Sequence, residues 1–200
     1  MNTILVAEYQ AGPENQVSPH LIAQFISCGM VLMTSQVGSA LIFPAACATA
    51  AQVSFAVRHS TGLIHAALRS SRLDHLRIPD QPVLDSEDSG CRFTVAVDAT
   101  HQIGTGISSR DRARTLRVLA DPCTTPTDLT RPGHVVPIRC ADSPRPVHRD
   151  RWDIAIRLVE MAGYAPVAAA CELVTDGGDV LEGNAARLFA DVHRLPVLDI

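Results

Sequence analysis

The chain has 200 residues and a formal net charge of −4 at pH 7, and 46% of its residues are hydrophobic. This length is most simply one domain, spanning residues 1–200, with a full hydrophobic core. The negative net charge argues against nucleic acid as a partner. No apolar stretch is long enough to cross a bilayer, so we expect no membrane contact. Residues 1–10 lack the basic start of a signal peptide, and a cytoplasmic location is the default expectation.

Two features of the composition bear on chemistry. All seventeen basic residues are arginine, so no lysine can form a Schiff base or anchor pyridoxal phosphate. The six cysteines are spread along the chain with no C-x-x-C pair, which argues against a zinc site. We therefore expect reduced, mostly buried thiols and no cofactor.

The first half of the chain reads as short helices and strands. Ser18 followed by Pro19 predicts the start of a helix, which Gly29 ends. The elements expected after it are strands at 31–33 and 41–43 around a polar turn at 34–40, a helix at 46–58, a buried strand at 62–68 and a short helix at 70–76. A loop rich in Pro, Asp and Ser follows over 79–90.

The second half continues this mixture. Ser108 predicts a helix N-cap, with Asp111 three residues later as a capping-box partner. The expected elements are a strand at 92–98, a helix at 108–120, an irregular segment at 123–133, a strand at 135–139, a helix at 150–162, a strand at 167–175, a helix at 184–193 and a strand at 196–200. Strands next to one another and strands separated by helices together favour an α+β or mixed three-layer domain.

Several motifs occur in a fixed order along the chain. GISSRDRART at 106–115 is followed by LADP at 119–122 and RPGHVVPIR at 131–139, with RHSTG at 58–62, LIFPA at 41–45 and ACELV at 170–174. This set resembles the 3,4-dihydroxy-2-butanone 4-phosphate synthases, which make the four-carbon precursor of riboflavin. The resemblance extends from about Ser18 to Ile200. It implies that family's three-layer α/β sandwich, and a homodimer with active sites at the subunit interface.

The resemblance also implies two catalytic residues. His134 matches the histidine of the family's R-P-G-H motif, and Glu172 matches the glutamate of its C-E-[IL] motif. A histidine exchanges protons near neutral pH, and a carboxylate can orient it or act as a second base. This pair suits the enolisation of a hydroxyketone.

The family's metal ligands are replaced in this sequence. The acidic loop of the family, close to D-D-E-D-R-E-N-E-G-D, corresponds here to 33–40, which holds no carboxylate. The G-H-T-E motif falls on Asp150-Arg151-Trp152-Asp153, and a shift of three residues would put His148 at the histidine position instead. Arginine cannot bind a metal, and hydroxyls and an amide are poor ligands for Mg²⁺. We therefore expect no metal site.

Six residues are candidates for holding a small-molecule substrate in the same pocket. They are Ser35 and Gln36 in place of the acidic loop, Arg151, Trp152 and Asp153 in place of G-H-T-E, and His65 on the strand after RHSTG. Arg151 also ends a basic cluster with Arg145 and Arg149, which could hold a carboxylate or phosphate.

Three functions fit these observations. The first is a repurposed enzyme in specialised metabolism that carries out a metal-independent proton transfer, dehydration, rearrangement or cyclisation of a small carbonyl compound with lyase or isomerase chemistry. The second is the ordinary synthase, which converts ribulose 5-phosphate to dihydroxybutanone phosphate and formate. It would need metal ligands from elsewhere, such as Glu14, Asp150 or Asp153. The third is an inactive relative that binds a ligand or partner.

Overall fold

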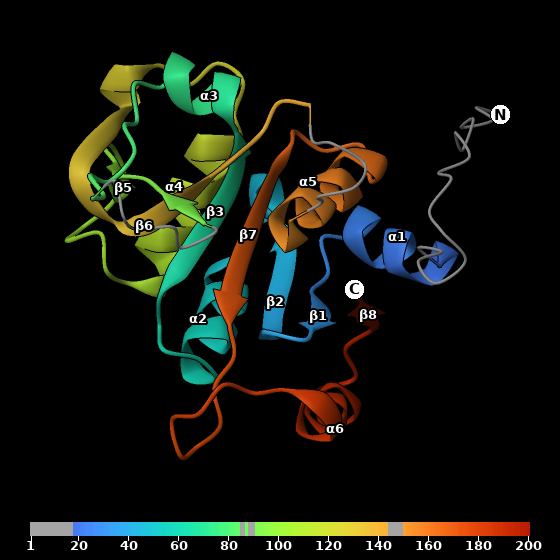
Figure 1. Cartoon of the computed structure of the whole chain (residues 1–200). Helices are drawn as coiled ribbons and strands as arrows, with labels where there is room; N and C mark the ends of the chain where they lie inside the picture. Colours follow the sequence, from blue (N-terminus) through green and yellow to red (C-terminus); the bar gives the residue numbers. More distant parts are fainter. Residues whose placement is uncertain (1–17, 85–86, 88–90, 144–149) are drawn as a thin grey trace, which may run out of the picture.

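The fold is a mixed sheet with helices on both faces (Figure 1). The computed structural model describes residues 18–84, 87, 91–143 and 150–200. The strands are β1 Val31–Ser35, β2 Gly38–Pro44, β3 Ile64–Arg69, β4 Arg92–Phe93, β5 Val97–Ala99, β6 Leu129–Cys140, β7 Val167–Glu172 and β8 Val197–Asp199. The α-helices are α1 Pro19–Ile26, α2 Ala50–Arg58, α3 Ser70–His75, α4 Ser109–Ala120, α5 Arg151–Met161 and α6 Gly183–His193.

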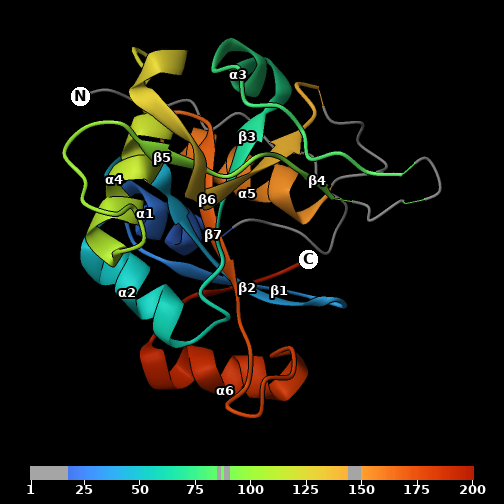
Figure 2. The same ribbon diagram turned by 90° about the vertical axis from the view of Figure 1, so that its left-hand side faces the viewer.

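Each face of the sheet has its own core. The strand order is β4-β6-β3-β7-β2-β1-β8, and β5 pairs with β6. One core packs α2, α4 and α6 against the sheet, and the other packs α1 and α5 against the opposite face. Figure 2 shows α2 and α4 on one side of the strands and α5 on the other. This arrangement confirms the expected α+β, three-layer fold, and it explains why β2 is buried along its whole length.

The register across β3 positions the candidate site. His65 on β3 lies opposite Val136 of the parallel β6 and Ala170 of the antiparallel β7. His134 and Glu172 each lie two residues from these partners, toward the end of the sheet where β3 begins. The two strands are separated by β3 alone, so their backbones are roughly 10 Å apart.

Several element boundaries differ from the sequence expectation. The helix expected from residue 46 begins at Ala50, because Thr49 caps it in a reciprocal capping box with Gln52, and a 3₁₀ turn, η1 (Ala45–Cys47), precedes it. The expected turn at 34–40 is a tight hairpin, because β1 and β2 pair up to Ser35 and Gly38.

The strand expected at 92–98 is two short strands. Between them Thr94 donates from both its backbone nitrogen and its hydroxyl to the carbonyl of Pro137, which turns this segment out of the regular ladder. The segment expected to be irregular contains the 3₁₀ turn η2 (Pro126–Asp128) and the start of β6, because Leu129 pairs with Ala99 of β5.

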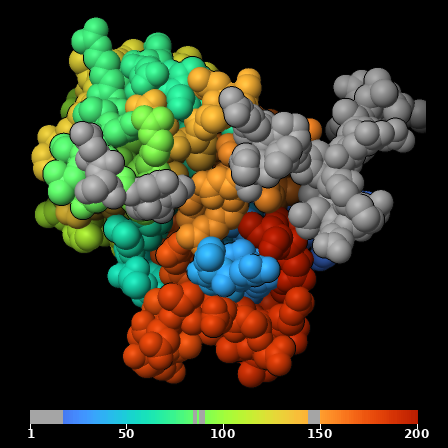
Figure 3. Space-filling view, in the orientation of Figure 1, coloured from blue at the N-terminus to red at the C-terminus, as the bar shows by residue number. Residues whose placement is uncertain are grey.

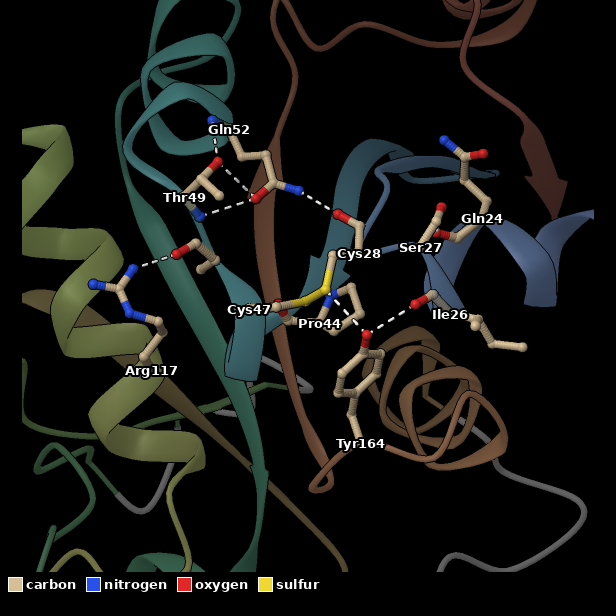
Figure 4. The surroundings of a disulfide bond; sticks show 11 residues. Gln24, Ile26, Ser27, Cys28, Pro44, Cys47, Thr49, Gln52, Arg117 and Tyr164 are labelled. Atoms are coloured by element: carbon tan, nitrogen blue, oxygen red, sulfur yellow. Dashed lines mark hydrogen bonds between the residues drawn. A yellow bond between two sulfur atoms is a disulfide. The ribbon is translucent and has the colours of Figure 1, made fainter.

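The expectation of reduced thiols is wrong for two of the cysteines, since Cys28 and Cys47 form a disulfide between the end of α1 and η1. Figure 4 shows its surroundings. Gln52 donates to the Cys28 carbonyl at 2.5 Å, and the Tyr164 hydroxyl lies 3.1 Å from the Cys28 sulfur while it donates to Ile26. The bond therefore ties α1 to the start of α2.

No helix in the described part of the chain has the length and apolar character needed to cross a membrane.

Candidate active site

His134 is paired with an aspartate on the neighbouring strand. Its ring Nδ1 lies 2.6 Å from Oδ2 of Asp98, and its backbone N–H donates to Oδ1 of the same carboxylate at 3.0 Å. Asp98 is buried, whereas the His134 side chain is 38% exposed. A carboxylate at Nδ1 holds the ring proton there, so the other nitrogen, Nε2, is left as a proton acceptor facing outward.

The local backbone around this pair depends on two glycines. A Cβ at Gly133 would lie 2.0 Å from the carbonyl carbon of Val97, so only glycine lets β6 approach β5 this closely. Gly106 has a φ of +89°, and a Cβ there would meet both Asp98 and His134. The R-P-G-H and T-G-I-S segments therefore need these glycines to bring the histidine and its partner together.

Asp111 fixes the loop that covers the pair. Ser108 caps α4 by accepting from the Asp111 backbone nitrogen, as expected. The carboxylate of Asp111 does not complete a capping box but accepts from the nitrogens of Gly104 and Gly106, each at 3.2 Å. The R-D-R part of the motif thus holds the glycine loop against His134.

Glu172, the last residue of β7, is paired with the first residue of α5. Arg151 donates a hydrogen bond from Nη2 to Oε1 of Glu172, and its guanidinium lies 4.4 Å from the centre of the Trp152 ring. The Arg151 side chain is largely buried, while that of Glu172 is 45% exposed. The two residues place a positive and a negative group together at the end of the sheet.

His134 and Glu172, one from each pair, lie on the same face of the sheet. Val135 and Cys171 belong to the core beneath α4, so their neighbours His134 and Glu172 point to the opposite face, which α5 covers. No hydrogen bond or ion pair joins His134 to Glu172 within the residues that the structure describes. A substrate between them could contact both.

His65 forms the floor between the two pairs. The residue is buried, its Nδ1 lies 3.2 Å from the Val136 carbonyl, and its ring centre lies 5.4 Å from Phe93 and 6.4 Å from Trp152. Burial lowers the pKa of His65, and Arg151 acts in the same direction, while the Val136 bond and Glu172 raise it. His65 is therefore a neutral imidazole at pH 7.

Cys91 lies against the same tryptophan. Trp152 is buried and hydrogen-bonds the Cys91 thiol, whose pKa is raised to about 11, chiefly by burial. A thiol with this pKa stays protonated at neutral pH, so Cys91 is a wall of the site and not a nucleophile.

The β1–β2 hairpin supplies no charge. Ser35 donates its hydroxyl to the Gly38 carbonyl at 3.0 Å and accepts from Val37, while Gln36 is exposed. The hairpin is near the site because Ala40 pairs with Glu172. Figure 3 shows the hairpin, in light blue, at the surface between α5 and the C-terminal segments. The Ser35 hydroxyl is used in closing the turn.

Asp153 has a structural partner. Its carboxylate accepts from Arg69 at 2.8 Å, and both side chains are nearly buried. This ion pair joins α5 to the end of β3, away from Glu172. Of the basic cluster, Arg151 lies in the site, whereas Arg145, His148 and Arg149 lie outside the described residues, as does Glu14.

The described residues do not fit a magnesium site. Mg²⁺ is usually bound through one or two carboxylates, but the segment at 33–40 offers only the hydroxyls of Thr34, Ser35 and Ser39 and the amide of Gln36. Arg151 instead places a cation beside Glu172, and no group of three His, Cys, Asp or Glu side chains in the described chain could hold a metal ion.

Sequence reasoning missed Asp98, Asp111 and Cys91 as members of this site. Asp98 lies 36 residues before His134, and only the pairing of β5 with β6 brings them together. The spacing of Asp111 from Ser108 predicts a helix cap, but it does not indicate the contacts of Asp111 with Gly104 and Gly106.

Comparison with known proteins identifies the family. The sequence profile described as 3,4-dihydroxy-2-butanone 4-phosphate synthase matches residues 20–200. The chain belongs to this family. It is 41% identical over 165 residues to the riboflavin biosynthesis protein RibBA of Mycobacterium ulcerans and of Mycobacterium tuberculosis, covering 80% of this chain. The chain spans 38% of the length of these relatives.

Solved structures support the same family assignment. A crystal structure of 3,4-dihydroxy-2-butanone 4-phosphate synthase in complex with two magnesium ions superposes with a TM-score of 0.83 and 32% identity, over 90% of this chain and 91% of that one. A cation-free form of such a synthase gives a TM-score of 0.81 and 31% identity, over 92% and 93% of the two chains.

Proposed function

We propose that the chain is an enzyme that moves a proton at a carbon beside a carbonyl group of a small substrate, with His134 as the base. The observation that carries this proposal is the His134–Asp98 pair, which leaves Nε2 free at an exposed edge. The carboxylate stabilises the imidazolium that forms when Nε2 accepts a proton. Membership of the 3,4-dihydroxy-2-butanone 4-phosphate synthase family supports this proposal.

The Arg151–Glu172 pair stabilises the negative charge that develops on the substrate during the proton transfer. When a proton leaves the carbon, negative charge develops on the carbonyl oxygen, and preorganised donors are most effective there. A guanidinium has five N–H donors, and Arg151 donates one of them to Glu172, so others can face the oxygen. Arg151 thereby supplies the positive charge for which a metal would otherwise be used.

The floor of the site favours a substrate with an apolar part. Phe93 and Trp152 flank the neutral His65, and Arg151 lies over the indole ring. Trp152 and His65 are buried, so the partly exposed Phe93 is the ring that a substrate between His134 and Glu172 could contact. Within this proposal the reaction is a dehydration, rearrangement or cyclisation of a carbonyl compound, in specialised metabolism.

A second candidate function is the family's own reaction, from ribulose 5-phosphate to dihydroxybutanone phosphate and formate. The 41% identity to RibBA proteins and the TM-score of 0.83 to a magnesium-bound synthase favour it. It would require metal ligands beyond those of the hairpin. Asp153 is committed to Arg69, and Asp150 caps α5 by accepting from the Trp152 nitrogen.

Proton exchange tests the first proposal without knowledge of the product. Wild type and His134→Gln would be incubated with hydroxyacetone in D₂O with EDTA, and deuterium at the carbons beside the carbonyl followed by NMR. We expect exchange in the wild type and its loss in the variant. Equal exchange rates in the two proteins would remove His134 from the mechanism.

We also propose that the chain forms a homodimer with its sites at the interface. Leu63, which precedes β3 at the site end, is 48% exposed, and Ile107 in the covering loop is 53% exposed. A partner subunit would bury both. A monomer in sedimentation velocity at micromolar concentration would contradict this assignment.

A further inference from the structure

A cavity borders α4, on the face of the sheet opposite the one that α5 covers. Its volume is about 570 Å³, and its lining includes Arg114 and Arg117 of α4, His101, and the loop at 121–124. Ala165, two residues before β7 begins, also lines it. So does Ala99, which follows Asp98 in β5, so the cavity comes close to the His134–Asp98 pair along that strand.

Two arginines face this cavity without an acidic partner. No hydrogen bond or ion pair is found for the Arg114 guanidinium among the described residues, and its Nε is buried without a partner. Among the described residues, Arg117 donates to the Ala48 carbonyl and to no carboxylate, and Figure 4 shows the Arg117 side chain with this bond dashed. The two lie three residues apart on α4 and are neighbours on its surface. Burial lowers the pKa of Arg117, and the charge of Arg114 adds to this shift.

The two carboxylates in the lining accept hydrogen bonds from residues close to them in the sequence. Asp121 accepts from the Cys123 nitrogen at 2.9 Å, and Asp128 accepts from the nitrogen and hydroxyl of Thr125 at 2.8 and 2.7 Å. His101 lies near Asp128 and lowers its pKa, although the local bonds to Thr125 contribute more. Both carboxylates keep their negative charge, but among the described residues neither forms an ion pair with Arg114 or Arg117, so these two guanidinium groups keep N–H donors for a ligand.

We propose that this cavity binds a small organic anion with two or more negative charges, of the phosphomonoester or diphosphate class. Arginine forks match phosphate oxygens with paired N–H donors. The volume lies within the usual range for small-molecule sites, roughly 300–1,000 Å³, and exceeds what inorganic phosphate fills. Val118, Ala120 and Pro122 provide an apolar wall for the remainder of the ligand.

Pyrophosphate is a suitable probe, titrated by calorimetry at constant ionic strength into wild type and single variants. We expect saturable binding in the wild type, and at least about a tenfold loss in Arg114→Gln, the scale of one charge-assisted hydrogen bond. Arg114 forms no hydrogen bond or ion pair within the described part of the chain, so this variant should fold, and circular dichroism checks that it does. Arg114→Lys keeps the charge but not the fork, and should recover binding only in part.

Two controls locate the binding. Arg110→Gln removes the same charge from an exposed position of α4 that does not line the cavity, and should bind as the wild type does. Arg151→Gln removes the arginine of the candidate active site and should also leave binding unchanged. Loss of binding in Arg151→Gln with retention in Arg114→Gln would overturn the inference, as would an absence of saturable binding at millimolar pyrophosphate.

Discussion

The guanidinium of Arg151 and the carboxylate of Glu172 form an ion pair where α5 begins and β7 ends. Each group lowers the cost of burying the other, because an unpaired charge in a partly buried position is strongly disfavoured. The pair also sets the electrostatics of the candidate site, since it puts one fixed positive group on the face that His134 shares. The first prediction concerns this arginine.

Arg151→Met should reduce kcat/KM by roughly a hundredfold to a thousandfold, the usual effect of removing one preorganised donor to a developing oxyanion. Arg151→Lys should lose less, because it keeps the charge but not the planar fork. Arg157→Met, an exposed position on the same helix, is the matched control and should be near wild type. If Arg151→Met lowers only the affinity for substrate and leaves kcat intact, the residue positions substrate and does not stabilise charge.

The His134–Asp98 pair leads to a second prediction. His134→Gln and Glu172→Gln should each lose about a hundredfold or more, as is usual for general acid–base groups. Asp98→Asn should also lose about a hundredfold or more, because an amide no longer requires the ring proton to stay on Nδ1. Steady-state rates with the substrate found by the exchange assay would measure this. An Asp98→Asn protein with the wild-type rate would show that the aspartate serves only to hold the strand.

Parts of this site could be predicted from the sequence. His134 and Glu172 were found because they stand within continuous motifs. Asp98 was not, because its role depends on a register shift between β5 and β6 that no local pattern encodes. Asp153 was grouped with Arg151 by sequence adjacency, yet successive helical residues point in different directions, and it meets Arg69 instead. The α+β fold followed from periodicity, whereas the break between β4 and β5 depends on Pro137, which lies far along the chain.

Stability should depend on pH through His65. Its folded-state pKa lies below the ordinary value of 6.5, chiefly because of burial. Below pH 6.5, His65 binds a proton in the unfolded chain but stays neutral in the folded protein. The free energy of unfolding should therefore decrease as the pH drops from 6.5 toward the folded-state pKa. His59, whose pKa is also lowered, acts in the same direction. Urea unfolding at a series of pH values should show a shallower fall in His65→Gln, and an unchanged slope would mean that the histidine is protonated in the folded state.

The Cys28–Cys47 disulfide should contribute measurably to stability. It closes a segment with a sequence separation of 19, for which loop entropy gives about 3 kcal/mol. Cys47→Ser should lose stability on that scale, and reductant should then have no further effect on the variant. Cys123→Ser, at an exposed free cysteine, is the control. A wild-type unfolding midpoint that does not change with reductant would show that the bond is absent in solution.

We propose that the His134–Asp98 and Arg151–Glu172 pairs perform the chemistry of this chain without a metal ion. The most direct measurement is formate release from ribulose 5-phosphate, with magnesium and in parallel with EDTA, alongside a magnesium-dependent synthase as positive control. We predict no formate above the background from this chain in either condition. Formate release at an enzymatic rate that EDTA abolishes would contradict the claim and establish the ordinary synthase reaction.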